Sequence, residues 1–512
     1  MISSHAARDP AKPAAIMANG GESLTYGELE RRSRQLARLL RERGLLEGDR
    51  VAILMESRLD WFVVMWAARR SSLRFVPINW HLKAAEARYV LENSDAKAIV
   101  TSERLLDLAS ELVDGNDLVG VRLTSGPSRR GFESLSASID PYSAAPLDRE
   151  YEGGAMPYSS GTSGRPKGIL RPLTGAPFGT PNGLETLLSS LYELDERTIY
   201  LSPAPQYHAA PVGWTMAVMG FGGTVVVLEP FDAEGVLKAI ETYRVTHAQF
   251  VPTHFVRLLK LPPEIANRYD LSSLRWAIHA AAPCPPEVKL RMMDWWGPIL
   301  HEYYGGSERF GFASIGPEDW LTHRGSVGRS RMGPVHVVDP DTGWECEPRT
   351  VGLIYLENTE GFAYHKDPDK TRECLSPSGW GTHGDMGWVD SEGFIYLADR
   401  QSNMIISGGV NIYPQEVENV LITHPSVSDV AVIGVPNAEY GEEVKAVVKL
   451  VDGLAASPDL AAQLMALCRA EIAGFKCPKS VDFVDELPRH PNGKLLKREL
   501  RAQYWPDARV RI

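Results

Sequence analysis

Hydroxyls, glycines and two cations are concentrated in one eleven-residue segment, Tyr158-Ser-Ser-Gly-Thr-Ser-Gly-Arg-Pro-Lys-Gly168. Glycines let backbone N–H groups approach phosphate oxygens, the hydroxyls add donors, and the two cations supply positive charge. The segment therefore predicts a phosphate-binding loop. It is not a Walker A loop, because Lys167 is followed by glycine rather than by serine or threonine. A flexible surface loop could share this composition.

Four later segments carry residues suited to the same chemistry. They are Tyr304-Gly-Gly-Ser-Glu308, Gly384-Asp-Met-Gly-Trp388, Asp399-Arg-Gln-Ser-Asn-Met-Ile-Ile-Ser-Gly-Gly-Val-Asn-Ile-Tyr-Pro414 and Pro488-Arg-His-Pro-Asn-Gly-Lys494. In order and spacing, the five segments resemble the motifs of the adenylate-forming superfamily. Residues 279–284 and 407–414 are most similar to the fatty-acyl and bile-acid CoA ligase branch. The resemblance runs from the middle of the chain almost to its end.

The resemblance implies a reaction in two halves. A carboxylate attacks the α-phosphate of ATP and releases pyrophosphate, and the thiol of CoA then attacks the acyl-adenylate. An anion must approach a polyanion in the first half, so Mg²⁺ and cationic side chains are expected to neutralise charge. The implied ligands are thus ATP, Mg²⁺, CoA and a carboxylic acid.

Residue by residue, the resemblance assigns three catalytic side chains: Lys494, Glu308 and His208. Glu308 and Thr162 would hold the metal, Tyr304 would stack on adenine, and Asp385 and Arg400 would bind the ribose and phosphates. The full set of implied nucleotide and CoA contacts is Ser159, Ser160, Gly161, Thr162, Ser163, Gly164, Lys167, Ala280, Ala281, Ala282, Tyr304, Gly305, Gly306, Ser307, Asp385, Arg400, Gly408, Gly409 and Lys476.

The acid-binding pocket is the part that the sequence defines least. Its candidate walls are Tyr207, His208, Val212, Trp214, Phe250, His279, Gly305 and Gly306. Small lining residues leave volume for a hydrophobic acid. An aromatic or histidine at such positions is nearly as often part of the core.

Alternating helical and strand patterns predict an α/β fold with doubly wound parallel sheets. A helix is expected over residues 26–43 with Thr25 as its N-cap. Short apolar runs predict strands at 51–54, 75–78, 98–100, 225–228, 248–251 and 276–278. The polar stretch 125–148 reads as a surface connection between two α/β units.

After about residue 400 the pattern changes to a small α+β unit, with strands expected at 430–435 and 444–451 and a helix at about 458–473. The resemblance implies that residues 1–400 form the AMP-binding and acid-binding domain and residues 401–512 a mobile C-terminal domain. Its hinge would lie at 400–403. Ser402 stands where the family usually has Lys or Asp, which leaves the charge interaction of the hinge in doubt.

Composition and charge exclude several other classes. The 512 residues include 44% hydrophobic and 23% charged residues, which is typical of globular proteins. A net charge of −11 opposes general binding to nucleic acid or anionic membrane. The uncharged stretch 209–228 is broken by proline and glycines and predicts a buried helix and strand, with no integral membrane segment. Five cysteines without C-x-x-C spacing, and no apolar leader, favour the cytoplasm.

Three functions remain open. The first is an acid:CoA ligase, favoured by Ser407-Gly408-Gly409, whose small residues leave room for a pantetheine arm. The second keeps the adenylation and transfers the acyl group to an amine. The third is a non-catalytic adenylate-binding protein, which the presence of all five motifs disfavours. The sequence leaves a homodimer open.

Overall fold

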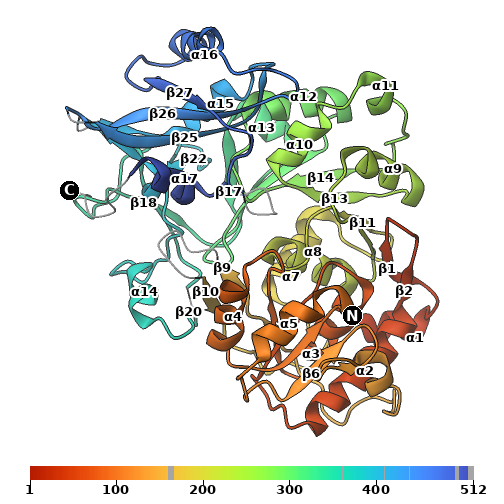
Figure 1. Cartoon of the computed structure of the whole chain (residues 1–512). Helices are drawn as coiled ribbons and strands as arrows, with labels where there is room; N and C mark the ends of the chain where they lie inside the picture. The colour runs from red at the N-terminus through yellow and green to blue at the C-terminus, as the bar shows by residue number, and fades with distance from the viewer. Residues whose placement is uncertain (160–165, 360, 409, 438, 490–494, 506–512) are drawn as a thin grey trace. The chain divides into compact units, whose positions relative to one another are not determined.

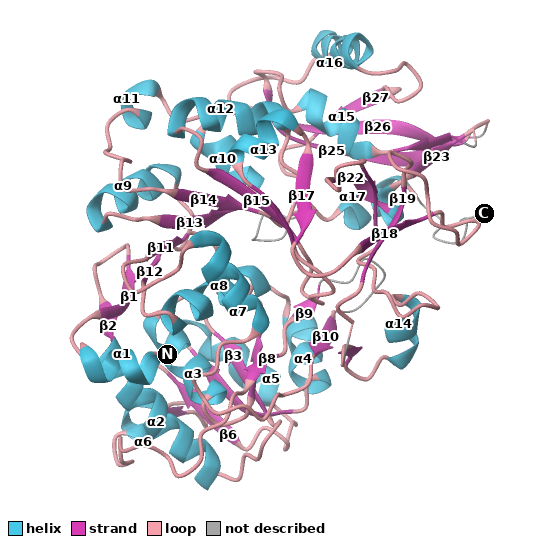
Figure 2. Cartoon of the chain, turned by 180° about the vertical axis from the view of Figure 1, so that it is seen from behind, coloured by secondary structure: helices cyan, strands magenta, loops and turns pink. Residues whose placement is uncertain are grey.

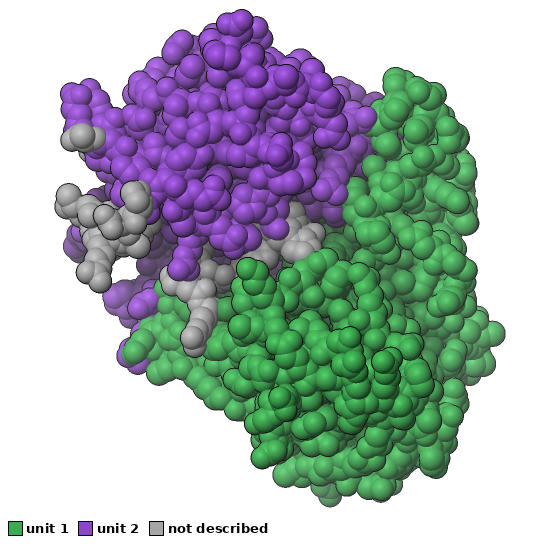
Figure 3. All heavy atoms as spheres, in the orientation of Figure 1, with its two compact units in different colours: residues 1–250, 261–277, 360–371 green, residues 251–260, 278–359, 372–512 purple. Residues whose placement is uncertain are grey.

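The computed structural model describes residues 1–512 except 160–165, 360, 409, 438, 490–494 and 506–512 (Figure 1). The chain divides into two compact units, coloured separately in Figure 3. Unit 1 comprises residues 1–250, 261–277 and 360–371, and unit 2 comprises residues 251–260, 278–359 and 372–512. Both units combine helices with β-sheets, so the predicted α/β class is confirmed.

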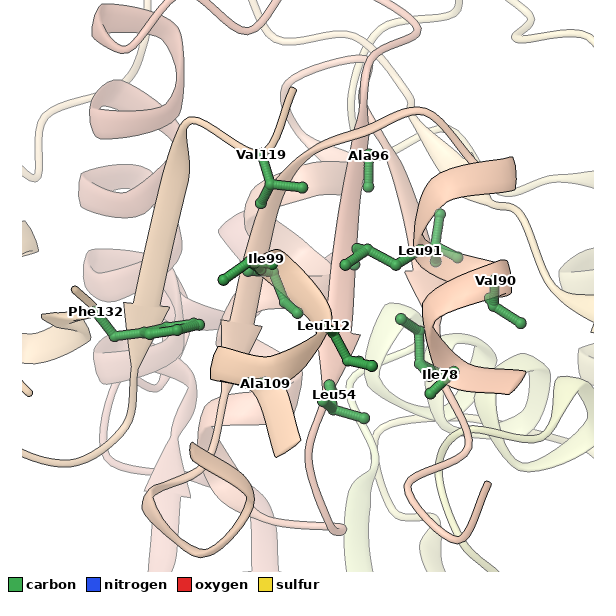
Figure 4. Packing of buried hydrophobic residues seen from close by; sticks show 14 of the residues in the cluster. Leu54, Ile78, Val90, Leu91, Ala96, Ile99, Ala109, Leu112, Val119 and Phe132 are labelled. Atoms are coloured by element: carbon green, nitrogen blue, oxygen red, sulfur yellow. The ribbon is translucent and has the colours of Figure 1, made fainter. Parts of the chain in front are cut away.

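The first sheet of unit 1 is parallel throughout, in the order β7-β6-β5-β3-β4-β8. Its strands are β3 (Arg50–Leu54), β4 (Arg74–Pro77), β5 (Ala96–Thr101), β6 (Val121–Thr124), β7 (Glu133–Ser134) and β8 (Gly154–Ala155). Side chains alternate between its faces. Phe75 meets Trp61 of α3 (Leu59–Arg69), whereas Val76 packs with α4 (Ala84–Asn93) and α5 (Leu106–Val113) in the cluster of Figure 4.

The second sheet of unit 1 pairs β13-β11-β12-β1 in parallel and adds β2 in the antiparallel direction. These strands are β13 (His247–Phe250), β11 (Ile199–Ser202), β12 (Thr224–Val227), β1 (Pro13–Met17) and β2 (Ser23–Thr25). A small antiparallel sheet joins β9 (Tyr158–Ser159), β10 (Lys167–Leu170) and β20 (Ala363–Tyr364).

Two helix predictions for unit 1 are confirmed. Helix α2 (Tyr26–Glu42) begins after Thr25, whose Oγ1 accepts a hydrogen bond from the backbone N–H of Glu28 at 3.2 Å. The uncharged stretch forms the mostly buried helix α8 (Ala209–Gly220) and then β12. Within the described chain, no helix combines the length and apolar composition that crossing a bilayer requires.

The prediction that residues 125–148 connect two α/β units is wrong, although most of these residues are exposed as expected. The stretch contains β7 and helix α6 (Leu135–Ile139), which packs against α2 within unit 1. Phe132, Leu135 and Ile139 are buried, with 2%, 0% and 1% of their surfaces exposed. Leu135 and Ile139 lie on one side of α6, whereas Phe132 precedes β7, and the surrounding serines and prolines obscure this pattern.

The main sheet of unit 2 is antiparallel over β15-β16-β17-β22-β21-β19-β18. Its strands are β15 (Leu300–Tyr304), β16 (Ala313–Ile315), β17 (Ser326–Ser330), β18 (Val335–Val338), β19 (Gly352–Leu356), β21 (Asp385–Val389) and β22 (Ile395–Arg400). Strand β14 (Trp276–His279) spans the boundary between the units.

The α-helices not yet named that precede the C-terminal lobe are α1 (Ile2–Arg8), α7 (Gly183–Tyr192), α9 (Ala233–Tyr243), α10 (Pro252–Leu258), α11 (Pro263–Ala266), α12 (Pro286–Trp296), α13 (Pro317–Thr322) and α14 (Pro368–Glu373).

The C-terminal lobe of unit 2 confirms the predicted small α+β domain (Figure 2). Its sheet contains β23 (Ile405–Ser407), β24 (Val410–Ile412), β25 (Val427–Asn437), β26 (Gly441–Leu450) and β27 (Ser480–Phe483). Alternate residues of β25 face opposite sides. Val430 and Val432 pack with α15 (Pro414–Leu421) and α16 (Pro458–Glu471), whereas Ala431 and Ile433 pack with α17 (Lys497–Tyr504). The boundary at residue 400 stays a prediction.

A buried ion-pair cluster holds three segments of unit 1 together. The Arg69 guanidinium lies 2.5 Å from Glu152 Oε2 and donates to both carboxylate oxygens of Glu185, at 2.6 and 3.0 Å. Arg69 is 1% exposed. Removing one member of a buried ion pair leaves an uncompensated charge in the interior, which costs more than the net value of the pair.

We therefore expect Arg69→Met to lower the free energy of unfolding by about 3–5 kcal/mol. Urea denaturation followed by circular dichroism measures this change. Arg197→Met is the matched control, because Arg197 is 84% exposed and pairs with Asp195 at the surface, where water screens an ion pair and its contribution to stability is small. Equal midpoints for the two variants would contradict a structural role for the buried cluster.

Candidate active site

Side chains from three strands of unit 2 meet at one carboxylate. Tyr304, the last residue of β15, donates its hydroxyl to Asp385 Oδ2 at 2.8 Å. Arg400 Nε lies 3.3 Å from Asp385 Oδ1. The antiparallel register places Asp385, which opens β21, directly opposite Arg400, which closes β22. The two oxygens of Asp385 are thereby held by different partners from different strands.

Tyr304 is buried next to this carboxylate. Burial, reinforced by the negative charge of Asp385, raises the pKa of Tyr304 well above its usual value. The phenol therefore stays protonated at neutral pH and keeps acting as the donor to Asp385. Arg400 has 35% of its side-chain surface exposed to solvent, compared with 13% for Asp385, so its guanidinium is accessible to a ligand.

Glu308 lies in the loop that follows Tyr304 and approaches His383. The distance from His383 Nδ1 to Glu308 Oε2 is 3.4 Å. A Cβ atom on Gly306 would lie 2.3 Å from His383 Cε1, so the imidazole fills the space beside this glycine. His383 thus fills the space into which a side chain at residue 306 would project, and the predicted contact of Gly306 with the acid stays a prediction. At Gly305, a Cβ would lie 3.2 Å from the carbonyl oxygen of Gly311.

A second buried cluster of polar side chains includes His279, the residue directly before Ala280, Ala281 and Ala282. Lys289 Nζ is 2.7 Å from Glu302 Oε2, and His279 Nε2 is 3.5 Å from the same oxygen. Burial lowers the pKa of His279 well below its usual value, so its ring is neutral. The described contacts of His279 are with the protein interior, and its predicted contact with the acid stays a prediction.

The predicted phosphate loop is described only at its two ends. Ser159 on β9 pairs with Lys167 on β10 in antiparallel register. Lys167 Nζ lies 4.0 Å from Asp367 Oδ2 and 5.5 Å from the ring centroid of Tyr364. The predicted contacts Ser160, Gly161, Thr162, Ser163 and Gly164 lie outside the described residues, as do Gly409 and Lys494.

The predicted acid-pocket residues of unit 1 lie on or beside buried elements. The rings of Tyr207 and His208, immediately before α8, have centroids 4.3 Å apart. Trp214 on α8 stacks with Tyr200, with centroids 5.8 Å apart. Val212 and Phe250 are also buried. Core packing accounts for these positions, and their contact with an acid stays a prediction.

Two predicted CoA contacts lie in the C-terminal lobe. Lys476 is engaged in an ion pair with Glu416 at 2.5 Å, so a CoA phosphate would have to compete for it. Gly408 has a φ of +58°, a conformation that favours glycine, and its N–H donates to the carbonyl oxygen of Tyr440 at 2.8 Å.

Motif matching missed a charge cluster beside the predicted hinge. Lys497 Nζ lies 2.7 Å from Glu418 and 3.7 Å from Asp399, the residue before Arg400. Burial alone would lower the pKa of Lys497, but the carboxylates of Glu418 and Asp399 raise it. Asp399 also accepts from Asn403 Nδ2 at 2.9 Å. The pair formed by Lys497 and Asp399 supplies a charge interaction beside the predicted hinge without involving Ser402. No pattern in the sequence indicated this pair.

His383 was also missed, although it lies two residues before Asp385. The motif that was singled out begins at Gly384, and a histidine in a turn gives no signal of its partners.

A metal would depend on few protein ligands here, because the described residues contain no group of three or more His, Cys, Asp or Glu that could hold one. Glu308 together with phosphate oxygens and water fits the preference of Mg²⁺.

Comparison with known proteins identifies the family. The profile of the AMP-binding enzyme family matches residues 2–362, and that of the AMP-binding enzyme C-terminal domain matches residues 416–494. The chain belongs to this family and is an adenylate-forming, ATP-binding ligase. It is 35% identical to feruloyl-CoA synthase from Amycolatopsis sp over 495 residues, which are 96% of this chain and 96% of that protein.

Two solved structures resemble the whole chain. ATP-bound MatB from Rhodopseudomonas palustris matches with a TM-score of 0.82 and 27% identity, over 98% of this chain and 99% of that one. The amide bond synthetase McbA from Marinactinospora thermotolerans matches with a TM-score of 0.82 and 28% identity, over 98% and 100%. The family is thus defined, whereas the acyl acceptor is not.

The contact between Tyr304 and Asp385 generates a direct test. Tyr304→Phe removes the hydrogen bond that holds Asp385, the carboxylate expected to bind the ribose. Because Asp385 would then be less well positioned, we expect AMP to bind about 10-fold more weakly, equivalent to ~1.4 kcal/mol. Isothermal titration calorimetry measures the affinity. The matched control is Tyr396→Phe, because Tyr396 also donates to a carboxylate, Asp390, at 3.4 Å. An equal loss in both variants, or none in Tyr304→Phe, would refute a specific role for this contact.

Proposed function

We propose that the protein is an ATP- and Mg²⁺-dependent acid:CoA ligase that activates a hydrophobic carboxylic acid as an acyl-adenylate. The observation that carries this proposal is the group formed by Tyr304, Asp385 and Arg400, with Glu308 in the adjoining loop. An aromatic ring can stack on the base of a nucleotide, a fixed carboxylate can accept hydrogen bonds from its ribose, and an accessible guanidinium can bind its phosphates.

Each of these side chains has a distinct task. Asp385 has lone pairs that can accept the two ribose hydroxyls, because its present partners use only part of its capacity. Arg400 would contact ribose or phosphate, Tyr304 would stack on adenine, and Ser307 would reach the α-phosphate. When bound, Mg²⁺ would neutralise phosphate charge, with Glu308 and Thr162 holding it.

The proposed first half-reaction forms a bond between an acid oxygen and the α-phosphorus and breaks the bond to pyrophosphate. Lys494 would place a compact positive charge where negative charge concentrates in the transition state. Since Lys494 belongs to residues 401–512, this domain would close for adenylation and turn about residues 400–403 to admit the thiol. The division of the chain at residue 400 is part of this proposal.

CoA is the proposed acceptor. Similarity to a feruloyl-CoA synthase along 96% of the chain supports it, as does the small-residue segment 407–409. The similarity to an amide bond synthetase keeps an amine as the second candidate acceptor. Free cysteines at all five positions, each among the described residues, agree with the proposed cytoplasmic location.

Product analysis separates the acceptors. A panel of aromatic and aliphatic acids, with ferulic acid among them, is incubated with ATP and Mg²⁺, and CoA or an amine is then offered separately. We expect acyl-CoA as the product by mass spectrometry. Amide without any thioester would establish the second candidate, and no acid-dependent exchange of labelled pyrophosphate into ATP would favour a non-catalytic protein.

The role of Lys494 separates the two half-reactions. We expect Lys494→Ala to slow adenylate formation by about 10²–10³-fold, because it removes a charge that acts in the transition state. Thioester formation from supplied acyl-adenylate should be nearly unchanged. Lys449→Ala is the control, since Lys449 pairs with the exposed Glu486. Equal losses in both half-reactions would contradict the assigned role.

A further inference from the structure

His383 lies in the turn that leads into Asp385 and packs against the loop that carries Glu308. Its ring is stacked against Phe310, with centroids 5.1 Å apart and an interplanar angle of 24°. Tyr304 approaches it edge-on at 6.1 Å. Only 4% of the side chain is exposed, so the imidazole is almost fully enclosed by residues of the candidate site.

The two nitrogens of this ring are buried, and neither has a hydrogen-bond partner among the residues that the structure describes. Leaving a buried polar group without a hydrogen bond is unfavourable, because the group has lost its contacts with water. Glu308 Oε2 is an acceptor that lies 3.4 Å from Nδ1. This separation exceeds the usual 2.7–3.2 Å range for N–H···O bonds by only a few tenths of an ångström.

We propose that His383 is the positioning residue for Glu308. Its Nδ1–H donates to Glu308 Oε2 when metal and nucleotide bind, which leaves Oε1 to face the cation. This inference rests on the proposed function, because it takes Glu308 as the carboxylate that holds Mg²⁺. A carboxylate that binds a metal commonly receives such an orienting hydrogen bond, and loss of the partner typically weakens metal binding or activity by 10–100-fold.

The surrounding packing fixes the imidazole in the position that this role requires. The missing side chain of Gly306 makes the close approach of the ring possible, since a Cβ there would lie 2.5 Å from Nδ1. Phe310 supports one face of the ring. His383 is also only two residues from Asp385, so one short turn carries both the imidazole that faces Glu308 and the carboxylate that would hold the ribose.

Three variants separate hydrogen bonding from packing. His383→Phe keeps an aromatic ring beside Phe310 and removes both nitrogens. His383→Asn retains an N–H donor close to the position of Nδ1, whereas His383→Gln moves the donor toward that of Nε2. The thermal midpoint of each variant reports whether the fold is retained.

Calorimetry without any acid present then measures two affinities, that of ATP as a function of Mg²⁺ concentration and that of AMP in EDTA. We expect His383→Phe and His383→Gln to raise the Mg²⁺ concentration needed for tight ATP binding by about 10–100-fold. AMP affinity should be unchanged. His383→Asn should restore most of the Mg²⁺ response, and His383→Phe should have little further effect in a Glu308→Gln background.

The outcomes distinguish this inference from the function on which it rests. If Glu308→Gln alters the Mg²⁺ response and His383→Phe does not, His383 has no positioning role and the metal site of the proposed function stands. If Glu308→Gln has no effect either, the assignment of the metal to Glu308 fails. Equal weakening of AMP and Mg²⁺–ATP by His383→Phe would show that the residue only supports the fold and would overturn the inference.

Discussion

The carboxylate of Asp385 imposes the constraint on which the site in unit 2 depends. It receives a hydroxyl from β15 and a guanidinium from β22 while it occupies the first position of β21. A carboxylate that is only 13% exposed and is held on both oxygens fixes the relative positions of the strand ends around it. The loop with Glu308 begins directly after Tyr304, so its starting point is fixed by the same interaction.

Hydrophobic patterning predicted the parallel strands and the C-terminal lobe because apolar runs and helical periodicity report burial directly. It missed the antiparallel sheet of unit 2, where short strands such as β16 and β18 have no long apolar run. It also misread residues 125–148, where four buried side chains are surrounded by serine and proline.

Motif recognition placed Tyr304, Asp385 and Arg400 in one site, and the structure brings these three side chains into contact. It could not find His383 or Lys497, because the importance of each arises from partners far away in the chain. His383 lies 75 positions from Glu308, and Lys497 lies 79 positions from Glu418. Pairings over such separations follow from the fold and leave no local periodicity.

The ion pair between Lys497 and Asp399 has a consequence for motion. Asp399 precedes the proposed pivot, whereas Lys497 belongs to the lobe that would turn, and their charged atoms lie 3.7 Å apart in a largely buried environment. A rotation about residues 400–403 that separates them must hydrate a sheltered ammonium group and a carboxylate at the same time. The ion pair between Lys497 and Asp399 therefore stabilises the present arrangement against the proposed rotation.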